Sequence, residues 1–311
     1  MKKLTTIFLS LSLAILESCS WVNDNYDHCP TGTWVQLSYT YNMLYSEAIA
    51  THITGASLFV MDEEGNRVTE KTVSSATLQE NNYRVQLPDL PTGNYHICVW
   101  AGLEDPNYLY SDTGIALNMT GEVHDQALGN LLYGRVDKVN ITQEYQIVEV
   151  PMVKDNKLIT TTLQLLSQQG TLKADEFGIE ISANNRQIDN NNQPSGAVVY
   201  SPILHTATQL DGLHVVQSGF HTLRLLQNDG TRMKLTHLPT QSKVFDIPLT
   251  DYLILSGMTD LLNMGEQEYL DREDHFNLIF FLNETQIPDR PYACTLLQIR
   301  SWILRMNETE L

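Results

Sequence analysis

The densest group of chemically active side chains in this 311-residue sequence is the run Asp271-Arg272-Glu273-Asp274-His275. A pair of carboxylates can carry out the acid–base chemistry of a glycosidase, and a set of carboxylates can hold a metal ion. The competing interpretation is a charged turn in which Arg272 neutralises the acidic residues beside it. The sequence favours the turn, so we predict a structural role for these side chains and no catalytic residue among them.

A second group of oxygen-bearing side chains runs from Asp189 to Asn192. This group lacks the spaced Asp residues and the bidentate Glu of a calcium-binding loop, so a solvated loop is predicted instead. His214 and His221 lie seven positions apart on either side of Gly219, and no HExxH pattern accompanies them. We therefore interpret both as ordinary strand or loop histidines.

Motifs for nucleophilic catalysis and for phosphate binding are absent from the sequence. The segment Gln217-Ser218-Gly219 lacks the first glycine of a G-x-S-x-G motif, and no glycine-rich phosphate loop occurs. The chain has 19 Lys and Arg against 37 Asp and Glu, for a net charge of −18, which opposes binding to nucleic acid or to anionic lipid. The sequence thus predicts a protein that is not an enzyme, needs no metal or cofactor and binds no nucleic acid.

The residue with the most specific predicted chemistry is Cys19. Two N-terminal lysines precede an apolar run of 13 residues, 4–16, which is too short for a membrane-spanning helix of about 20 residues but is typical of a secretory signal peptide. The run ends in Leu16-Glu17-Ser18-Cys19, which resembles a bacterial lipobox. In that class the chain is cleaved between Ser18 and Cys19, and the Cys19 thiol carries lipid. An ordinary signal peptide with a chance cysteine is the alternative, but the usual A-x-A cleavage site is absent.

The predicted lipid is also the only membrane element that the sequence offers. More than one lipid chain gives stable attachment, because each buried methylene contributes about 0.8 kcal/mol. No later stretch approaches 18 consecutive apolar residues. We therefore expect residues 1–18 to be a signal peptide that is removed and residues 19–30 to be a lipidated tether.

Three further cysteines remain: Cys29, Cys98 and Cys294. An odd number without a CxxC motif does not indicate a disulfide framework. A bridge between Cys29 and Cys98 stays open as an alternative in an oxidising envelope. Buried free thiols are the favoured interpretation of Cys98 and Cys294, because both lie in strand-like apolar runs.

The elements that position these residues are predicted to be β-strands, because short alternating apolar runs recur between turn signals. The run from Val35 to Tyr41 alternates strictly between apolar and polar side chains. The segment 57–61 leads into Asp62-Glu63-Glu64-Gly65-Asn66, a predicted hairpin turn. Trp34 and Trp100 are predicted to be core residues of such strands and not a platform for sugar rings.

The spacing of these strands, roughly 8–15 residues, favours β-sandwiches of the immunoglobulin-like type over βαβ units. At about 150 residues per domain, the length indicates two domains, and we place their boundary near Lys154-Asp155-Asn156. The predicted fold class is therefore all-β, with tandem sandwich domains at 31–153 and 154–311. Short helices are expected only near Ser46–Ile53 and Ser256–Asn263.

Several segments together resemble the fimbrillin-associated anchor lipoproteins of Bacteroidales. The resemblance spans nearly the whole chain, in order. It is carried by Asp27-His28-Cys29-Pro30 before the first strand, the hairpin Leu58-Phe59-Val60-Met61-Asp62-Glu63-x-Gly65, the segment Leu90-Pro91-x-Gly93-x-Tyr95 through Trp100, the run Tyr269-Leu270-Asp271-Arg272-Glu273-Asp274, and the closing Ile299-Arg300-Ser301-Trp302-Ile303-Leu304-Arg305.

This resemblance implies two transthyretin-like β-sandwich domains, held at the outer membrane by lipid on Cys19. It further implies a non-enzymatic, surface-exposed pilus component that attaches a fimbrial shaft to the cell and limits the length of that shaft. The implied partners are fimbrial shaft subunits, joined by β-strand exchange, in which main-chain hydrogen bonds at a sheet edge supply the affinity.

Two other classes of function stay open at this point. One is a surface lipoprotein that acts as an adhesin or as a glycan- or protein-binding module, alone or as a pilus tip subunit. It would show clustered exposed aromatic side chains. The other is a glycosidase or a metal hydrolase, which would show a carboxylate pair facing a pocket or a bound metal.

Overall fold

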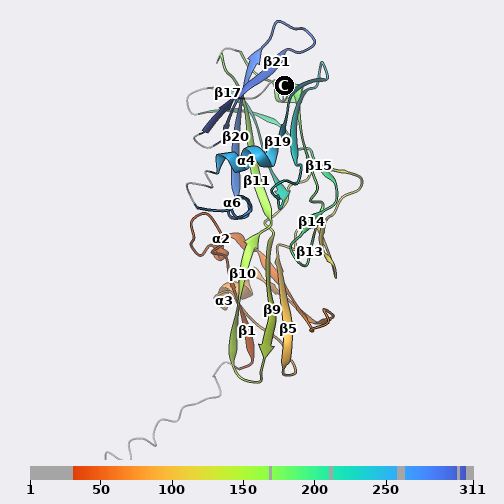
Figure 1. Cartoon of the computed structure of the whole chain (residues 1–311), viewed down its shortest axis with the longest axis vertical. Helices are drawn as coiled ribbons and strands as arrows, with labels where there is room; N and C mark the ends of the chain where they lie inside the picture. The colour runs from red at the N-terminus through yellow and green to blue at the C-terminus, as the bar shows by residue number, and fades with distance from the viewer. Residues whose placement is uncertain (1–30, 168–169, 210–212, 258–262, 300–301, 306–311) are drawn as a thin grey trace, which may run out of the picture.

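The computed structural model describes residues 31–167, 170–209, 213–257, 263–299 and 302–305. Most of the regular structure in these residues is β-strand, arranged in several sheets that pack as sandwiches. The predicted all-β fold class is therefore confirmed. Figure 1 shows an elongated molecule with β1, β5, β9 and β10 in one half and β11, β17, β20 and β21 in the other.

The first half is built on one seven-stranded sheet of order β3-β2-β5-β9-β10-β1-β4. Its strands are β1 (Thr33–Ser38), β2 (Gly55–Met61), β3 (Arg67–Ser74), β4 (Arg84–Gln86), β5 (Gly93–Ala101), β9 (Leu132–Ile141) and β10 (Gln146–Lys154). Residues Gln146–Pro151 of β10 pair in parallel with β1, whereas Met152–Lys154 pair in antiparallel fashion with β9. Because β10 passes from one set of partners to the other, β1 and β4 on one side and β2, β5 and β9 on the other contribute side chains to one apolar core.

Alternation along β1 decides which side chains enter this core. Val35 and Leu37 are buried, as is Tyr39 directly after the strand, whereas Gln36 between them is half-exposed. Trp100 is fully buried as predicted, but Trp34 lies on the opposite face of β1 and is only half-buried. The prediction of a core position for Trp34 is wrong, because a strand places neighbouring side chains on opposite faces.

The predicted hairpin turn between β2 and β3 is confirmed. Gly65 adopts a φ of +86°, which a residue without a Cβ tolerates best, and the Asn66 backbone amide donates to Asp62 Oδ1 at 2.7 Å. The turn sets the antiparallel register of β2 and β3.

The second half contains three sheets, of orders β16-β17-β11-β20-β21-β22, β19-β18-β12-β15-β8 and β14-β13-β7-β6. Their strands are β6 (Tyr108–Ser111), β7 (Gly114–Leu117), β8 (Val123–His124), β11 (Asn156–Leu165), β12 (Phe177–Ala183), β13 (Gln187–Asp189), β14 (Pro194–Ser195), β15 (Val198–Tyr200), β16 (His205–Thr208), β17 (His214–Leu223), β18 (Arg232–His237), β19 (Ser242–Pro248), β20 (His275–Glu284), β21 (Tyr292–Ile299) and β22 (Trp302–Arg305). The two larger sheets face each other, with Phe245 of β19 stacked on Phe280 of β20 at 4.2 Å between ring centroids.

Helices in the described ranges are few and short: α2 (Ile49–His52), α3 (Ser75–Glu80), α4 (Leu249–Ser256), α6 (Glu266–Arg272) and the 3₁₀ turn η3 (Ala174–Glu176). The expected helix at Ser46–Ile53 is confirmed over its second half. Most of the one expected at Ser256–Asn263 falls on residues 258–262, which lie outside the described residues, and α4 ends at Ser256. The buried residues of α4 include Leu249, Tyr252 and Leu253, at helical spacing.

The change from one half to the other takes place at Asp155, between the end of β10 and the start of β11. Strands β7 and β8 nevertheless pair with β13 and β15, so a segment that precedes residue 154 joins the sheets of the second half. Phe59 of β2 also stacks on Tyr110 of β6, with ring centroids 4.2 Å apart. The domain boundary near Lys154 stays a prediction.

Candidate functional site

The residues predicted to carry the lipid chemistry, Ser18 and Cys19, lie outside the described residues, as does Cys29. Cys98 and Cys294 are free and almost completely buried, as predicted. Burial raises the pKa of each thiol to about 12, so neither is a reactive thiolate near neutral pH.

The acidic run at 271–275 does not form a charged surface turn. Its first member, Asp271, is the penultimate residue of α6 and is only 5% exposed. Both carboxylate oxygens of Asp271 accept hydrogen bonds from Arg224, from Nε at 2.8 Å and from Nη2 at 2.7 Å. Arg272 pairs instead with Glu268 at 2.7 Å. The prediction that Arg272 neutralises its neighbours is therefore wrong, because the helix turns its side chain away from Asp271 and towards position i−4.

A buried polar cluster surrounds the Arg224–Asp271 pair at the meeting point of β10 and β11. We call Asp155, Lys157, Asn192, Arg224 and Asp271 the junction cluster. Lys157 Nζ donates to the Asp271 carbonyl at 2.6 Å, Asn192 Nδ2 donates to Asp155 Oδ1 at 3.2 Å, and Arg224 Nη1 donates to the Asn192 carbonyl. Each charged side chain of the cluster thus has at least one polar partner, whereas Asp155 Oδ2 is buried without a hydrogen bond.

Burial also shifts the protonation equilibria in the junction cluster. It raises the pKa of Asp155 to about 7, against the opposing influence of the Arg224 guanidinium. It lowers the pKa of Lys157 to about 8, against the attraction of Asp271. Both shifts disfavour the charged form, which is the expected effect of desolvation.

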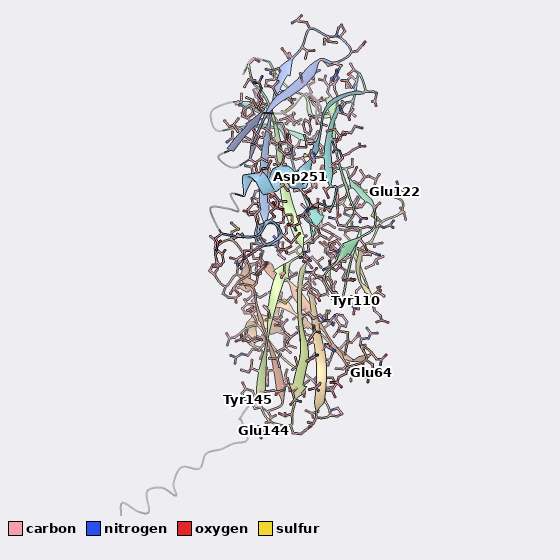
Figure 2. All side chains as sticks on the ribbon, viewed as in Figure 1. Glu64, Tyr110, Glu122, Glu144, Tyr145 and Asp251 are labelled. Carbon is pink, nitrogen blue, oxygen red and sulfur yellow. The ribbon has the colours of Figure 1, made fainter. Side chains whose placement is uncertain are left out.

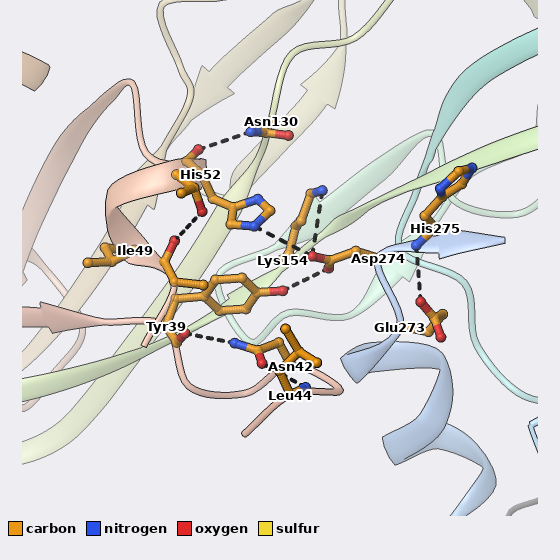
Figure 3. Close-up of polar contacts among 12 residues, drawn as sticks. Tyr39, Asn42, Leu44, Ile49, His52, Asn130, Lys154, Glu273, Asp274 and His275 are labelled. Atoms are coloured by element: carbon orange, nitrogen blue, oxygen red, sulfur yellow. Dashed lines mark hydrogen bonds and ion pairs between the residues drawn. The ribbon is translucent and has the colours of Figure 1, made fainter. Parts of the chain in front are cut away.

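Asp274 connects the two halves of the molecule directly (Figure 3). The hydroxyl of Tyr39, the residue after β1, donates to Asp274 Oδ1 at 2.7 Å. His52 Nε2 and Lys154 Nζ lie 3.7 and 4.0 Å from Asp274 Oδ2. Three groups from the first half therefore converge on one carboxylate that stands immediately before β20.

The loop at 189–192 was predicted to be solvated, and this is only partly correct. Asn192 is 8% exposed within the junction cluster. The Asn190 carbonyl accepts hydrogen bonds from the Tyr133 hydroxyl at 2.6 Å and from Arg135 Nη1 at 2.8 Å. Sequence reasoning missed these contacts, because a polar loop that bonds to strands more than 50 positions away has the same composition as one that faces water.

The contacts of Asp274 and Asn190 hold the two halves together, and the network does not resemble a catalytic centre. The carboxylates of Asp271 and Asp274 are engaged by groups from distant parts of the chain. Within the residues that the structure describes, no group of three or more His, Cys, Asp and Glu side chains could hold a metal ion. The chemistry of the site is therefore that of a structural ionic network.

Protonation of His221 is expected to make the stability of the protein depend on pH. The ring lies on β17 beside Leu158, and its pKa is lowered to about 4, mainly by burial and also by Lys154 and His275. In the unfolded chain a histidine has a pKa of about 6.5, so between pH 6.5 and pH 4 the unfolded state binds a proton that the folded state does not. The free energy of unfolding therefore decreases as the pH falls from about 6.5 towards 4. Glutamine does not titrate, so the free energy of unfolding of His221→Gln should fall less than that of the unmodified protein when the pH is lowered from 7 to 4.5. We expect the difference between the two proteins to change by about 1–2 kcal/mol in favour of the variant, a range reduced for the partial exposure of the ring. Urea denaturation of both proteins at the two pH values measures this gain; an unchanged difference would contradict it.

Comparison with known proteins defines first the class and then the family. The sheets are those of an all-β protein built from β-sandwiches. The chain belongs to the family described as "Fimbrillin-A associated anchor proteins Mfa1 and Mfa2", whose model matches residues 26–308. This membership gives the chain a fimbria-associated or adhesin-type role at the cell surface.

Solved structures of similar proteins share the fold over nearly the whole chain. A protein from Bacteroides thetaiotaomicron described as "a putative adhesin" is 27% identical, with a TM-score of 0.75 over 90% of this chain and 99% of that chain. Proteins from the same organism described as "putative polysaccharide binding proteins" are 24% identical, with a TM-score of 0.75 over 91% and 100%. The fimbrial anchor protein Mfa2 from Porphyromonas gingivalis is 14% identical, with a TM-score of 0.70 over 90% and 100%.

No curated protein matches the sequence. In the described part of the chain, none of the helices has the length and apolar character needed to cross a membrane.

Proposed function

We propose that this protein is a fimbrial anchor lipoprotein of the outer membrane, which attaches a fimbrial shaft to the cell and limits the length of that shaft. The family match over residues 26–308 carries the proposal. On this proposal the signal peptide is removed between Ser18 and Cys19, and lipid on Cys19 holds the mature chain. The match begins shortly after Cys19, where a tether would lead into the folded part.

The physical character of the described residues supports a structural role for the protein. The acidic side chains that could have served an enzyme are used in contacts within the fold, Asp271 with Arg224 and Asp274 with Tyr39. Several sheets end in open edges, among them β3 in the first half and β16 and β22 in the second. An open edge presents unpaired backbone groups, so strand exchange with a shaft subunit is a compatible mode of assembly.

Deleting the gene tests the proposed function in the cell. We expect the deletion strain to release fimbriae into the medium, and the released fimbriae to be longer than those of the parent strain, because both attachment and termination would be lost. Shaft subunit synthesis should continue at the parental level. Electron microscopy and immunoblotting of cells and medium measure both effects, and complementation with the intact gene is the control. Fimbriae that stay attached at parental length would reject the anchor function.

A glycan-binding adhesin is the second candidate, favoured by the 27% identical structure described as a putative adhesin. A sugar site commonly uses neighbouring exposed aromatic rings that present an apolar face. Among the described residues, Tyr45 and Tyr145 are the aromatic side chains with large exposure, and the ring of Tyr45 is stacked on the Arg272 guanidinium at 4.4 Å. Saturable binding of the purified mature chain to a glycan array, lost in Tyr45→Ala, would move the assignment to the adhesin.

A further inference from the structure

Two parallel strand pairs follow one another along the length of the molecule. In the first half β1 pairs with β10 over six residues, from Thr33 with Gln146 to Ser38 with Pro151. In the second half β11 pairs with β20 over eight residues, from Leu158 with His275 to Leu165 with Leu282. Most of the other strand pairs in the described residues are antiparallel, so these two pairs stand out as a continuous feature of the fold.

The two parallel pairs are coupled at the junction by short connections. The backbone runs from β10 to β11 through the single residue Asp155. The end of β1 is joined to the start of β20 by the hydrogen bond from the Tyr39 hydroxyl to Asp274. Each strand of the first pair is therefore linked to one strand of the second pair, β10 to β11 through the backbone and β1 to β20 through a side-chain hydrogen bond.

Additional hydrogen bonds hold the β10–β11 connection in place. The Asp155 amide donates to the Leu131 carbonyl at 2.8 Å. The Asn156 side chain donates to the Gly129 carbonyl at 2.6 Å and accepts from the Leu131 amide at 3.1 Å. Asn156 is fully buried, so these bonds are shielded from competition with water.

The ends of these strands determine how they would respond to a pull along the molecule. The β9–β10 turn, marked by Glu144 and Tyr145, lies at one end of the molecule (Figure 2), and β1 starts opposite Gln146 at that same end. The turn between β20 and β21 lies at the other end (Figure 1). A force between the start of β1 and that far turn would slide β1 against β10 and β11 against β20.

We propose that the pairs β1–β10 and β11–β20 form a load-bearing axis that carries tension from the N-terminal end of the chain to the far end of the second half. In this shear geometry all backbone hydrogen bonds of a pair are strained together and must break almost at once. Pulling two strands apart from a shared end breaks the same bonds one after another. The pairing is therefore mechanically strong only in the direction along which an anchored shaft would pull.

This inference rests on the proposed function for its biological setting, since tether and shaft must act at opposite ends. Its test is a separate measurement on the purified mature chain, residues 19–311. Fimbriae that stay attached in the deletion strain would reject the anchor function and leave the mechanical result intact. A negative mechanical result would reject the load-bearing axis and leave attachment intact.

The decisive experiment compares two pulling directions in a single-molecule force clamp. Handles at Thr31 and Asp289 load β1–β10 in shear, whereas handles at Thr31 and Glu144 pull the two strands apart from their shared end. All three positions are exposed and lie outside the strands. At equal force we expect the first half to survive at least tenfold longer in the shear geometry, because forced unfolding is governed by the unfolding rate. An equal or shorter lifetime in shear would overturn the proposal.

A substitution in β1 gives a second, independent measurement. Thr33 and Leu37 form backbone hydrogen bonds to Leu87 and Tyr83 on the β4 side, so the amide of Gln36 faces β10. Gln36→Pro removes this amide, and Gln36→Ala is the matched control that loses the same side chain but keeps the amide. We expect Gln36→Pro to shorten the shear lifetime about tenfold relative to Gln36→Ala. Equal lifetimes would contradict the proposal; if Gln36→Pro does not fold, the comparison of directions still decides.

Discussion

Replacing Arg224 with alanine is expected to destabilise the protein by about 3–5 kcal/mol, because it leaves a buried carboxylate without its partner. Asp271 is 5% exposed and accepts two hydrogen bonds from Arg224, at 2.7 and 2.8 Å. The Arg224 side chain also donates to the Asn192 carbonyl, so the substitution leaves a second acceptor without this donor. Equilibrium urea denaturation measures the loss.

Arg232→Ala is the matched control for this prediction. Arg232 pairs with Asp246 at 2.8 Å, but these side chains are 48% and 32% exposed. An exposed ion pair contributes about 0–1 kcal/mol, since water screens the charges and ordering the side chains has an entropic cost. Similar losses for Arg224→Ala and Arg232→Ala would contradict the importance of the junction cluster.

A double variant distinguishes the net stability that the Arg224–Asp271 ion pair contributes from the destabilisation that follows when one member is left buried without its partner. Replacing both members of a buried ion pair with apolar residues of similar size is often neutral or stabilising. We therefore expect Arg224→Met combined with Asp271→Leu to recover a large part of the stability that Arg224→Ala loses. A double variant less stable than Arg224→Ala would show that the hydrogen bonds lost to the Asn192 carbonyl and to the Gln267 side chain dominate instead.

Replacing Cys19 with alanine is expected to move nearly all of the protein from the membrane fraction to the soluble fraction. On the proposed function, lipid on Cys19 is what holds the chain, and its buried methylenes supply about 0.8 kcal/mol each. The net charge of −18 gives no electrostatic attraction to anionic lipid that could replace it. Ultracentrifugation followed by immunoblotting measures the distribution.

Cys29→Ala is the control for the lipidation prediction, because it removes a nearby thiol without touching the lipobox. This variant should remain in the membrane fraction like the unmodified protein. The single-anchor interpretation is wrong if Cys19→Ala still sediments with membranes after a high-salt wash. Mass spectrometry of the mature N-terminus identifies the lipid directly.

The local parts of the fold were predictable because they depend on neighbouring residues. Alternation at Val35 and Leu37 placed both side chains in a core. A glycine followed by an asparagine at 65–66 predicted the turn between β2 and β3, because the positive φ that the turn needs is available to glycine at little cost. The apolar surroundings of Cys98 and Cys294 predicted buried thiols for the same local reason.

The junction cluster was not predictable, because its contacts join residues that are far apart in the sequence. The acidic run at 271–275 carries the same composition whether it forms a surface turn, a catalytic pair or a buried network. The distinction depends on Arg224, 47 positions away, and on Tyr39, 235 positions away. The folding of the second half brings Arg224 to Asp271, and the packing of the two halves brings Tyr39 to Asp274.

The sequence by itself therefore determined the all-β class, the main turns and the resemblance to a fimbrial anchor family, since alternation, turn chemistry and short motifs are local properties. The tertiary structure decided the roles of the charged residues and the direction of strand pairing. Whether β1 lies parallel to β10, or β11 to β20, depends on chain crossovers and register across the whole fold, which leave no periodic signal within either strand.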